Sequence, residues 1–423
     1  MLGALAVQSG CSRRSGDFGA SKVEQLTSGP QHHWFGYYDK LQFDPTNRYV
    51  LGMAVDFEDR HPTPADAIGV GMVDRAAGNR WIPLATSRAW SWQQGCMLQW
   101  IPGSRDEIIF NDRERDSFVA RILNVRTRAT RTLPQPVYAL SPDGAIAVTT
   151  DFARIGMIRY GYGYPVRGGD KEKPVFAAPA DTGIWRMSVT SGQGSLILPL
   201  AKLMSWPGNR VLAPDAVHWT NHLLFSPDGS RVAFLHRWRE SNRTRTRLLT
   251  CDPDGGNLFQ INPGGTLSHF IWRDPTHLLA WASVPGRRGA GFYLFADRTR
   301  DVIPVGAGVM RENGHCTCLA GGRWVLNDTY ASAGNRLQEL YLYDTATKEK
   351  HSLGRFPMPA RFEGGRRCDL HPRASADGRL VAFDSTHREG RRQMYLIDVT
   401  EIVTSNRGVK SRGGSQFSQG DPS

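Results

Sequence analysis

A histidine recurs at one position of a repeated strand-turn-strand unit in the second half of the chain. The last copy spans residues 367–387, with a tight turn at 376–378. Four copies place a histidine ten residues before a central aliphatic residue, in the pairs His222 and Val232, His269 and Leu279, His315 and Val325, and His371 and Val381. The histidines lie 47, 46 and 56 residues apart. A period of this size with several strands per unit indicates a β-propeller.

Three earlier copies of the unit begin at Leu41, Leu98 and Tyr138, which brings the total to seven. Helical periodicity is nearly absent, so we expect an all-β, seven-bladed propeller over residues 30–400 as one domain. Residues 1–29 form a separate N-terminal segment, and the polar residues 401–423 form a flexible tail. The Gly-, Pro- and charge-rich insertion 159–182 is either a loop over one face or a disordered hairpin.

The first eleven residues form a short apolar stretch with small residues before Cys11. The stretch resembles the end of a bacterial lipoprotein signal, so it is either the remnant of an export signal, with lipid on Cys11, or a disordered terminus. No run of about 18 apolar residues exists, which excludes a helical membrane span. We therefore expect a monomeric protein that is periplasmic or secreted.

The formal net charge of +12 favours a polyanionic partner. Acidic polysaccharide, nucleic acid and anionic lipid all fit this charge, because arginine is spread over every repeat. No nucleic-acid-binding module or basic run is present, which makes nucleic acid the weaker choice.

The recurring histidines predict a ring of side chains on the propeller axis. The first strand of each blade lines the central channel, so residues in the same register of neighbouring blades face one another. Imidazole and thiolate are ligands for zinc or a similar divalent metal, such as manganese. The predicted ligands are His269, His315, Cys368 and His371, whereas His222 faces the substrate. A metal-free, hydrogen-bonded ring is the alternative.

The chain resembles the seven-bladed propeller polysaccharide lyases, which include the oligogalacturonate lyases and the ulvan lyases. The resemblance covers nearly all of residues 30–400. It rests on the motifs HHWFGYYDK (His32–Lys40), WQQGCMLQW (Trp92–Trp100), FNDR (Phe110–Arg113), DFARIG (Asp151–Gly156), HWTNHLLFSPDGSRVAFLHRW (His218–Trp238), SHFIWRD (Ser268–Asp274), GHCTC (Gly314–Cys318) and RCDLHP (Arg367–Pro372).

This resemblance implies cleavage of a uronate-containing glycan by β-elimination. A base removes the proton at C5, an acid protonates the departing O4, and a third group neutralises the carboxylate. In oligogalacturonate lyases a divalent metal held mainly by histidines binds the carboxylate, and a histidine with a nearby arginine moves the proton. In ulvan lyases histidine and tyrosine are acid and base, and arginine neutralises the carboxylate.

The resemblance suggests four catalytic residues. Tyr138 opens the first strand of blade three and Arg154 ends its next strand, with a spacing similar to the tyrosine–arginine pair of ulvan lyases. A packed tyrosine and a surface salt bridge are the alternatives. His236 resembles the proton-transfer histidine of oligogalacturonate lyases, and His33 stands at the entry to blade one. The predicted substrate-binding residues are His32, His61, Gln93, Asn111, Arg113 and His222.

Two positions depart from the family patterns. Gln93 stands near a position where some ulvan lyases carry a catalytic histidine, and Thr317 stands where the oligogalacturonate metal pattern expects a second histidine after His315. The main alternative function is therefore a non-catalytic, TolB-like propeller that binds a glycan or a protein. The absence of a G-x-S-x-G motif argues against a serine peptidase.

Overall fold

The computed structural model describes residues 22–159, 161–167, 175–206, 213–241, 243–262 and 265–405. The N-terminal residues that suggest an export signal, including Cys11, lie outside these ranges, as does the C-terminal tail from residue 406. None of the described helices is long and apolar enough to cross a membrane.

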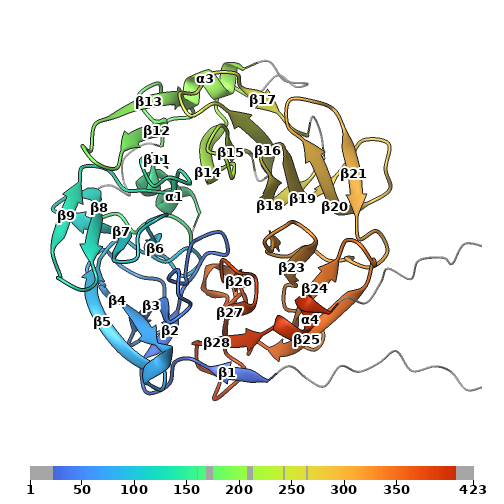
Figure 1. Cartoon of the computed structure of the whole chain (residues 1–423). Coiled ribbons are helices and arrows are strands. Elements are labelled where there is room, and N and C mark those ends of the chain that lie inside the picture. Colours follow the sequence, from blue (N-terminus) through green and yellow to red (C-terminus); the bar gives the residue numbers. More distant parts are fainter. Residues whose placement is uncertain are drawn as a thin grey trace, which may run out of the picture.

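Seven four-stranded antiparallel sheets surround a central axis, which confirms the seven-bladed propeller (Figure 1). Blade one contains β2 (His32–Trp34), β3 (Tyr49–Val55), β4 (Ile68–Asp74) and β5 (Arg80–Ser87). Blade two contains β6 (Gln99–Trp100), β7 (Glu107–Glu114), β8 (Ser117–Asn124) and β9 (Thr130–Leu133). Blade three contains β10 (Ala139–Leu140), β11 (Ile146–Thr149), β12 (Gly183–Ser188) and β13 (Gly194–Pro199).

The next three blades repeat the pattern. Blade four contains β14 (Val217–Phe225), β15 (Val232–Glu240), β16 (Arg243–Cys251) and β17 (Phe259–Gln260). Blade five contains β18 (Leu267–Asp274), β19 (His277–Ser283), β20 (Ala290–Ala296) and β21 (Val302–Val305). Blade six contains β22 (Thr317–Cys318), β23 (Trp324–Asp328), β24 (Leu337–Asp344) and β25 (Lys350–Pro357).

The seventh blade joins the two ends of the propeller. It contains β26 (Arg373–Ala374), β27 (Leu380–Ser385) and β28 (Gln393–Asp398), and its outer strand is β1 (Val23–Gln25) from the beginning of the described chain. Val23 pairs with Ile397 in this sheet, and Figure 1 shows β1 beside β28. The propeller therefore starts before Pro30, which is where the sequence analysis placed its first residue.

The described helices are few and short. They are η1 (Arg75–Ala77), α1 (Phe152–Ile158), α3 (Leu200–Ser205), η2 (Gly364–Arg366) and α4 (Thr400–Thr404). The α4 helix continues past residue 400, and Ile402 and Val403 pack on the apolar core around blades six and seven.

The repeated turns share one hydrogen-bonding scheme. In the turn after β14, the hydroxyl of Ser226 donates to the carboxylate of Asp228 at 2.6 Å, and the same carboxylate accepts the backbone N–H of Ser230. Gly229 has a φ of 74°, a conformation that glycine adopts without strain. The turns at 141–144 and 375–378 repeat this arrangement. In these three blades the sequence repeat is therefore a repeat of turn chemistry.

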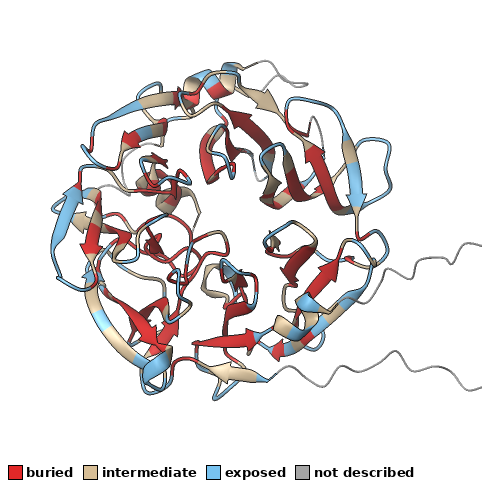
Figure 2. Ribbon diagram, in the orientation of Figure 1, coloured by how far each residue is buried: buried red, intermediate tan, exposed pale blue. Residues whose placement is uncertain are grey.

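Apolar side chains between the blades form the core, and burial increases towards the axis. β23 and β27 are buried along their full length, whereas outer strands such as β5 and β9 are largely exposed or half-buried. Figure 2 shows this gradient as buried inner strands and exposed outer edges. Polar side chains near the axis are consequently held in fixed, desolvated positions.

Candidate functional site

The four recurring histidines form a continuous group on the axis. Their ring centroids lie 5.6 Å apart for His222 and His269, 4.2 Å for His269 and His315, and 4.1 Å for His315 and His371. All four side chains are buried. The sequence register thus places one imidazole from each of blades four to seven in the same small volume.

A segment of blade one crosses the channel and packs against these histidines. The hydroxyl oxygen of Tyr37 lies 2.6 Å from the imidazole of His222, and the ring of Tyr37 also contacts His371. The hydroxyl of Tyr38 donates to the backbone carbonyl of Phe270 in blade five at 2.8 Å. The HHWFGYYDK motif therefore supplies an axial plug, residues 36–40. The sequence analysis did not assign it this role.

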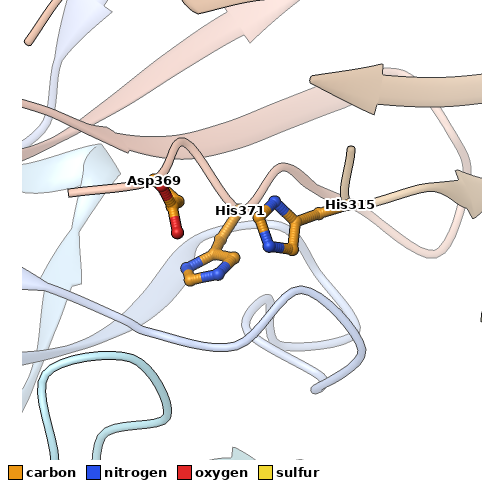
Figure 3. A group of neighbouring side chains, drawn as sticks. All are labelled: His315, Asp369 and His371. Atoms are coloured by element: carbon orange, nitrogen blue, oxygen red, sulfur yellow. The ribbon is translucent and has the colours of Figure 1, made fainter. Parts of the chain in front are cut away.

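Two of the four histidines combine with a carboxylate into a group that could hold a metal ion. One ligand atom from each of His315, Asp369 and His371 lies within 4.8 Å of the other two. Figure 3 shows the three side chains converging, with Asp369 and His371 from one segment and His315 from another. Nε2 of His371 is buried and has no hydrogen-bond partner among the described residues. This orphaned nitrogen and the donor set fit a divalent metal.

A second carboxylate, that of Asp328, contacts both histidines of this group and orients them. Nδ1 of His315 lies 3.0 Å from each carboxylate oxygen of Asp328, which also accepts the backbone N–H of His315 and of His371. A carboxylate that holds one ring nitrogen leaves the other available to a metal. Arg367 in turn donates to Asp369, with Nη2 at 2.9 Å from the carboxylate.

Cys368 does not belong to this group. Its side chain packs in an apolar cluster with Met358 and Phe362, and burial raises the pKa of its thiol to about 12. A thiol that stays protonated is a poor metal ligand. The prediction of Cys368 as a ligand is therefore corrected to its neighbour Asp369, because adjacent residues of an extended segment point to opposite sides.

His269 lies beside the metal-binding group and has other partners. Its Nδ1 is 3.1 Å from the hydroxyl of Ser268, and its Nε2 is 3.4 Å from the hydroxyl of Tyr330. It is not one of the three converging residues. His269 and His222 instead line a cavity next to the metal-binding group.

This axial cavity has a volume of about 480 Å³ and is rich in cations. Three arginines line it, and no aspartate or glutamate is among its described lining residues. Its polar and aromatic lining residues are Arg159, Tyr162, His222, Arg237, Thr266, Ser268, His269, Trp281, Asn313, Tyr330 and Arg367. Such a cavity favours an anionic ligand.

Arg237 is the one of these three arginines whose pKa is shown to be lowered. Burial, together with the like charge of Arg159, lowers its pKa to about 9. Its Nε atom is buried without a hydrogen-bond partner among the described residues. The sequence analysis did not select Arg237, because its burial depends on side chains that other blades bring to the axis.

Part of the insertion after α1 closes the cavity on one side. The backbone carbonyl of Gly161 accepts the N–H of Gln93, and Gly161 lies against Gly365: a Cβ there would come 2.4 Å from the Cα of Gly365. Tyr162 follows, with the guanidinium of Arg159 3.9 Å from its ring centroid. The described part of this insertion thus lies over one face of the propeller, as one of the two predicted alternatives states.

The predicted pair of Tyr138 and Arg154 is wrong as a catalytic arrangement. Arg154 lies in α1, not on a strand, and its guanidinium donates to the backbone carbonyls of Phe176, Ala177 and His218. Tyr138 is fully buried, and burial raises the pKa of its phenol, with no contribution from Arg154. Its hydroxyl accepts the side-chain amide of Gln94 and the backbone N–H of His222.

The two histidines predicted for proton transfer also lie away from the axial cavity. His236 is fully buried between His218, at 2.8 Å, and Nε of Arg247, at 3.0 Å. His33 lies 3.2 Å from the side-chain oxygen of Gln393. Neither lines the axial cavity, so their expected contact with the reacting atoms is not supported by the geometry.

The predicted substrate-binding residues fall into three groups. His222 lines the axial cavity, and His61 lines a smaller cavity beside it. Gln93 reaches the backbone carbonyls of Gly365 and Arg367, and so supports the wall of the axial cavity. The others are held within the fold: His32 pairs with Glu58, Asn111 bonds Val137 and Tyr164, and Arg113 donates to the backbone carbonyl of Pro165.

Comparison with known proteins identifies similar folds. No protein-family model matches the chain, and no curated protein matches its sequence. An oligogalacturonate lyase from Vibrio parahaemolyticus has a TM-score of 0.62 at 14% identity, covering 90% of this chain and 94% of that one. An oligogalacturonate lyase in complex with manganese has a TM-score of 0.65 at 15% identity, covering 89% and 93%.

The similarity extends to propellers with other activities. The β-propeller domain of the Trilobed protease from Pyrococcus furiosus has a TM-score of 0.50 at 11% identity, covering 86% of this chain and 96% of that one. At these identities the comparisons establish the propeller fold alone, so function has to be argued from the site.

Proposed function

We propose that the protein cleaves a uronate-containing acidic glycan by β-elimination. The observation that carries this proposal is the axial cavity, which is lined by three arginines and, among the described residues, by no carboxylate. It lies beside the His315–Asp369–His371 group. β-Elimination beside a carboxylate requires positive charge at that carboxylate, a base at C5 and an acid at the leaving oxygen. The cavity and its border contain groups for all three roles.

The neutralising group is a divalent metal, zinc or manganese, held by His315, Asp369 and His371. Bound there, the metal would act as a Lewis acid that neutralises the uronate carboxylate and makes the C5 proton more acidic. Two imidazoles and one carboxylate suit either metal. The fold similarity to an oligogalacturonate lyase in complex with manganese supports this assignment.

Arg237 is our candidate for the base. A guanidinium with an ordinary pKa above 12 is almost never neutral, whereas a pKa of about 9 leaves a small neutral fraction at pH 7 to 8. Arg237 lines the cavity, and its buried Nε has no competing partner among the described residues. These features suit a group that accepts a proton from C5 and then returns to its cationic form.

Tyr330 is our candidate for the acid. Its phenol lines the same cavity, and a phenol is protonated at neutral pH, so it can donate to the departing O4. Its ring lies 5.3 Å from the guanidinium of Arg367 and contacts the rings of His269 and His315. Proton transfer is thus assigned to Arg237 and Tyr330. An acidic glycan also fits the exported location that the N-terminal sequence suggests.

The unsaturated uronate product of β-elimination absorbs ultraviolet light, which gives a direct test. Purified protein supplied with Mn²⁺ or Zn²⁺ is incubated with polymers and oligomers of galacturonate, glucuronate and mannuronate, alone and mixed with neutral sugars. We expect absorbance to rise with at least one of them and to be abolished by a chelator. Binding of a glycan without any absorbance change would instead establish the non-catalytic, glycan-binding alternative.

A further inference from the structure

A second cavity of about 220 Å³ lies beside the axial cavity and shares Tyr162 with it. Its walls come from the loop after β3, the segment before β6, the end of α1 and residues 161–166. The same stretch that supplies Arg159 and Tyr162 to the axial cavity therefore supplies Gly156, Met157 and Tyr164 to this one. A ligand that extends from the axial cavity past Tyr162 would meet this second cavity next.

The two cavities differ in charge. No lysine, arginine, aspartate or glutamate is among the described residues that line the second cavity. His61 also lines it, and burial and the charge of Arg366 lower the pKa of this imidazole. The described lining residues therefore offer a carboxylate no charged side chain to replace its lost hydration, which favours an uncharged ligand.

The lining offers other kinds of contact. Trp90, Tyr162 and Tyr164 supply aromatic surface. Ser91 also lines the cavity, is 2% exposed, and has a buried hydroxyl with no hydrogen-bond partner among the described residues. Buried hydroxyls normally have partners, so an unpaired one beside a cavity points to a polar ligand atom. Aromatic surface with a hydroxyl suits the apolar faces and hydroxyl groups of a neutral sugar.

We propose that the second cavity is a subsite for an uncharged sugar residue next to the uronate that occupies the axial cavity. Its volume of about 220 Å³ accommodates one sugar ring. The substrate class is accordingly a mixed glycan in which uronates adjoin neutral sugars. This assignment rests on the proposed function, since it requires a uronate in the axial cavity.

Isothermal titration calorimetry on the full chain with Mn²⁺ tests the subsite without depending on turnover. The probes are two tetrasaccharides, one of galacturonate alone and one of alternating galacturonate and rhamnose, together with free galacturonate. We expect the alternating tetrasaccharide to bind about tenfold more tightly than tetragalacturonate, which is the discrimination that one well-filled pocket provides. Cleavage during titration is followed separately by ultraviolet absorbance.

Two kinds of variant separate the subsite from the axial cavity. Ser91→Ala should weaken binding of the alternating tetrasaccharide about three- to tenfold, the loss expected for one hydrogen bond. It should not change the affinity for free galacturonate or the Tm, because the hydroxyl has no partner within the described protein. Met157→Trp and Pro62→Trp, which place a larger side chain at two lining positions, should abolish the preference for the alternating tetrasaccharide. Ser195→Ala, on the exposed face of β13, is the matched control.

The outcomes distinguish the two proposals. Equal affinity for the tetrasaccharides, or a preference that Ser91→Ala and both tryptophan variants leave intact, would overturn the subsite while a uronate still binds. Selective binding without an unsaturated product would support the subsite and overturn the lyase reaction. Failure of all three probes to bind would refute a uronate site in the axial cavity, and the subsite would be refuted with it.

Discussion

The carboxylate of Asp328 lies 3.0 Å from Nδ1 of His315 through each of its oxygens. It also accepts the backbone N–H of His371 at 3.1 Å, which joins blade six to blade seven at the axis. Asp328 ends β23 and is fully buried, so its position is fixed by the blade. One side chain thus sets the orientation of two proposed metal ligands.

Replacing Asp328 should therefore weaken metal binding without removing a ligand. We expect Asp328→Asn to reduce the affinity for Mn²⁺ or Zn²⁺ about 10- to 100-fold, as is typical when the partner of a ligating histidine is lost. Competition with a chelating dye measures the change. Asp344→Asn removes another buried carboxylate of blade six, which pairs with Arg323 away from the axis, and should leave the metal affinity unchanged. Equal metal affinity in Asp328→Asn and the wild type would show that Asp328 does not orient the ligands.

Two adjacent residues distinguish the metal site predicted from sequence from the one observed in the structure. Asp369→Ala should abolish stoichiometric metal binding, because it removes one of three converging ligands. Cys368→Ala should keep the metal and lower the free energy of unfolding by about 1 to 2 kcal/mol through loss of packing with Met358 and Phe362. Elemental analysis and chemical denaturation of both variants give the answer. The reverse pattern would restore Cys368 as the ligand.

Features that depend on residues close together in the sequence were predictable, whereas features that depend on residues far apart were not. The blade repeat was predictable because each Ser-x-Asp-Gly turn is a local structure, and the shared register of His315 and His371 followed from it. The pairing of Val23 with Ile397 joins the two ends of the chain and has no local signature. Arg237 was missed for a similar reason, because side chains from other blades bury it.

Two errors at the site had signals that could have prevented them. Asp369 lies two residues before His371, the spacing that puts side chains on one side of an extended segment. Cys368 lies three residues before His371, so its side chain is expected on the other side. For Arg154, Asp151 was the signal: its carboxylate caps α1 by accepting the backbone N–H of Arg154. An Asp three residues before the arginine, at the start of an apolar run, indicates the beginning of a helix.

The phenol of Tyr138 should contribute to stability. Tyr138→Phe removes the acceptor for two buried donors, the side-chain amide of Gln94 and the backbone N–H of His222. Leaving a buried donor unpaired costs about 1 to 3 kcal/mol, so we expect a loss of that size in urea denaturation. Catalytic turnover at a temperature well below the Tm should stay within a few-fold of wild type. A loss of 100-fold or more in turnover with unchanged stability would return Tyr138 to the reaction.

Buried histidines should make the fold sensitive to acid. Burial, assisted by the charges of Arg247 and Arg154, lowers the pKa of His218 to about 4. Between pH 6.5 and 4 the unfolded chain therefore binds a proton at His218 that the folded chain does not, so the free energy of unfolding falls as the pH falls.

The contribution of His218 amounts to about 1.4 kcal/mol per pH unit across that window. Urea denaturation of His218→Gln and of the wild type from pH 7 to 4.5 compares their slopes. We expect a shallower slope in His218→Gln than in the wild type. Parallel curves for His218→Gln and the wild type would show that His218 is not held neutral.

Arg237 provides the sharpest test of the proposed chemistry. With a pKa of about 9, the fraction of neutral, proton-accepting Arg237 rises about tenfold for each unit that the pH is raised towards that value. Turnover of the best substrate should rise with pH in the same way and level off near pH 9.

Arg237→Met should lower turnover about 10²- to 10⁴-fold, the usual contribution of a general base, while metal content and stability stay close to wild type. Arg245→Met, on the exposed part of the neighbouring strand β16, is the matched control for loss of one positive charge. An Arg237→Met enzyme that only raises KM, with unchanged turnover and an unchanged pH profile, would make Arg237 a carboxylate-binding residue and assign the base to another group of the cavity.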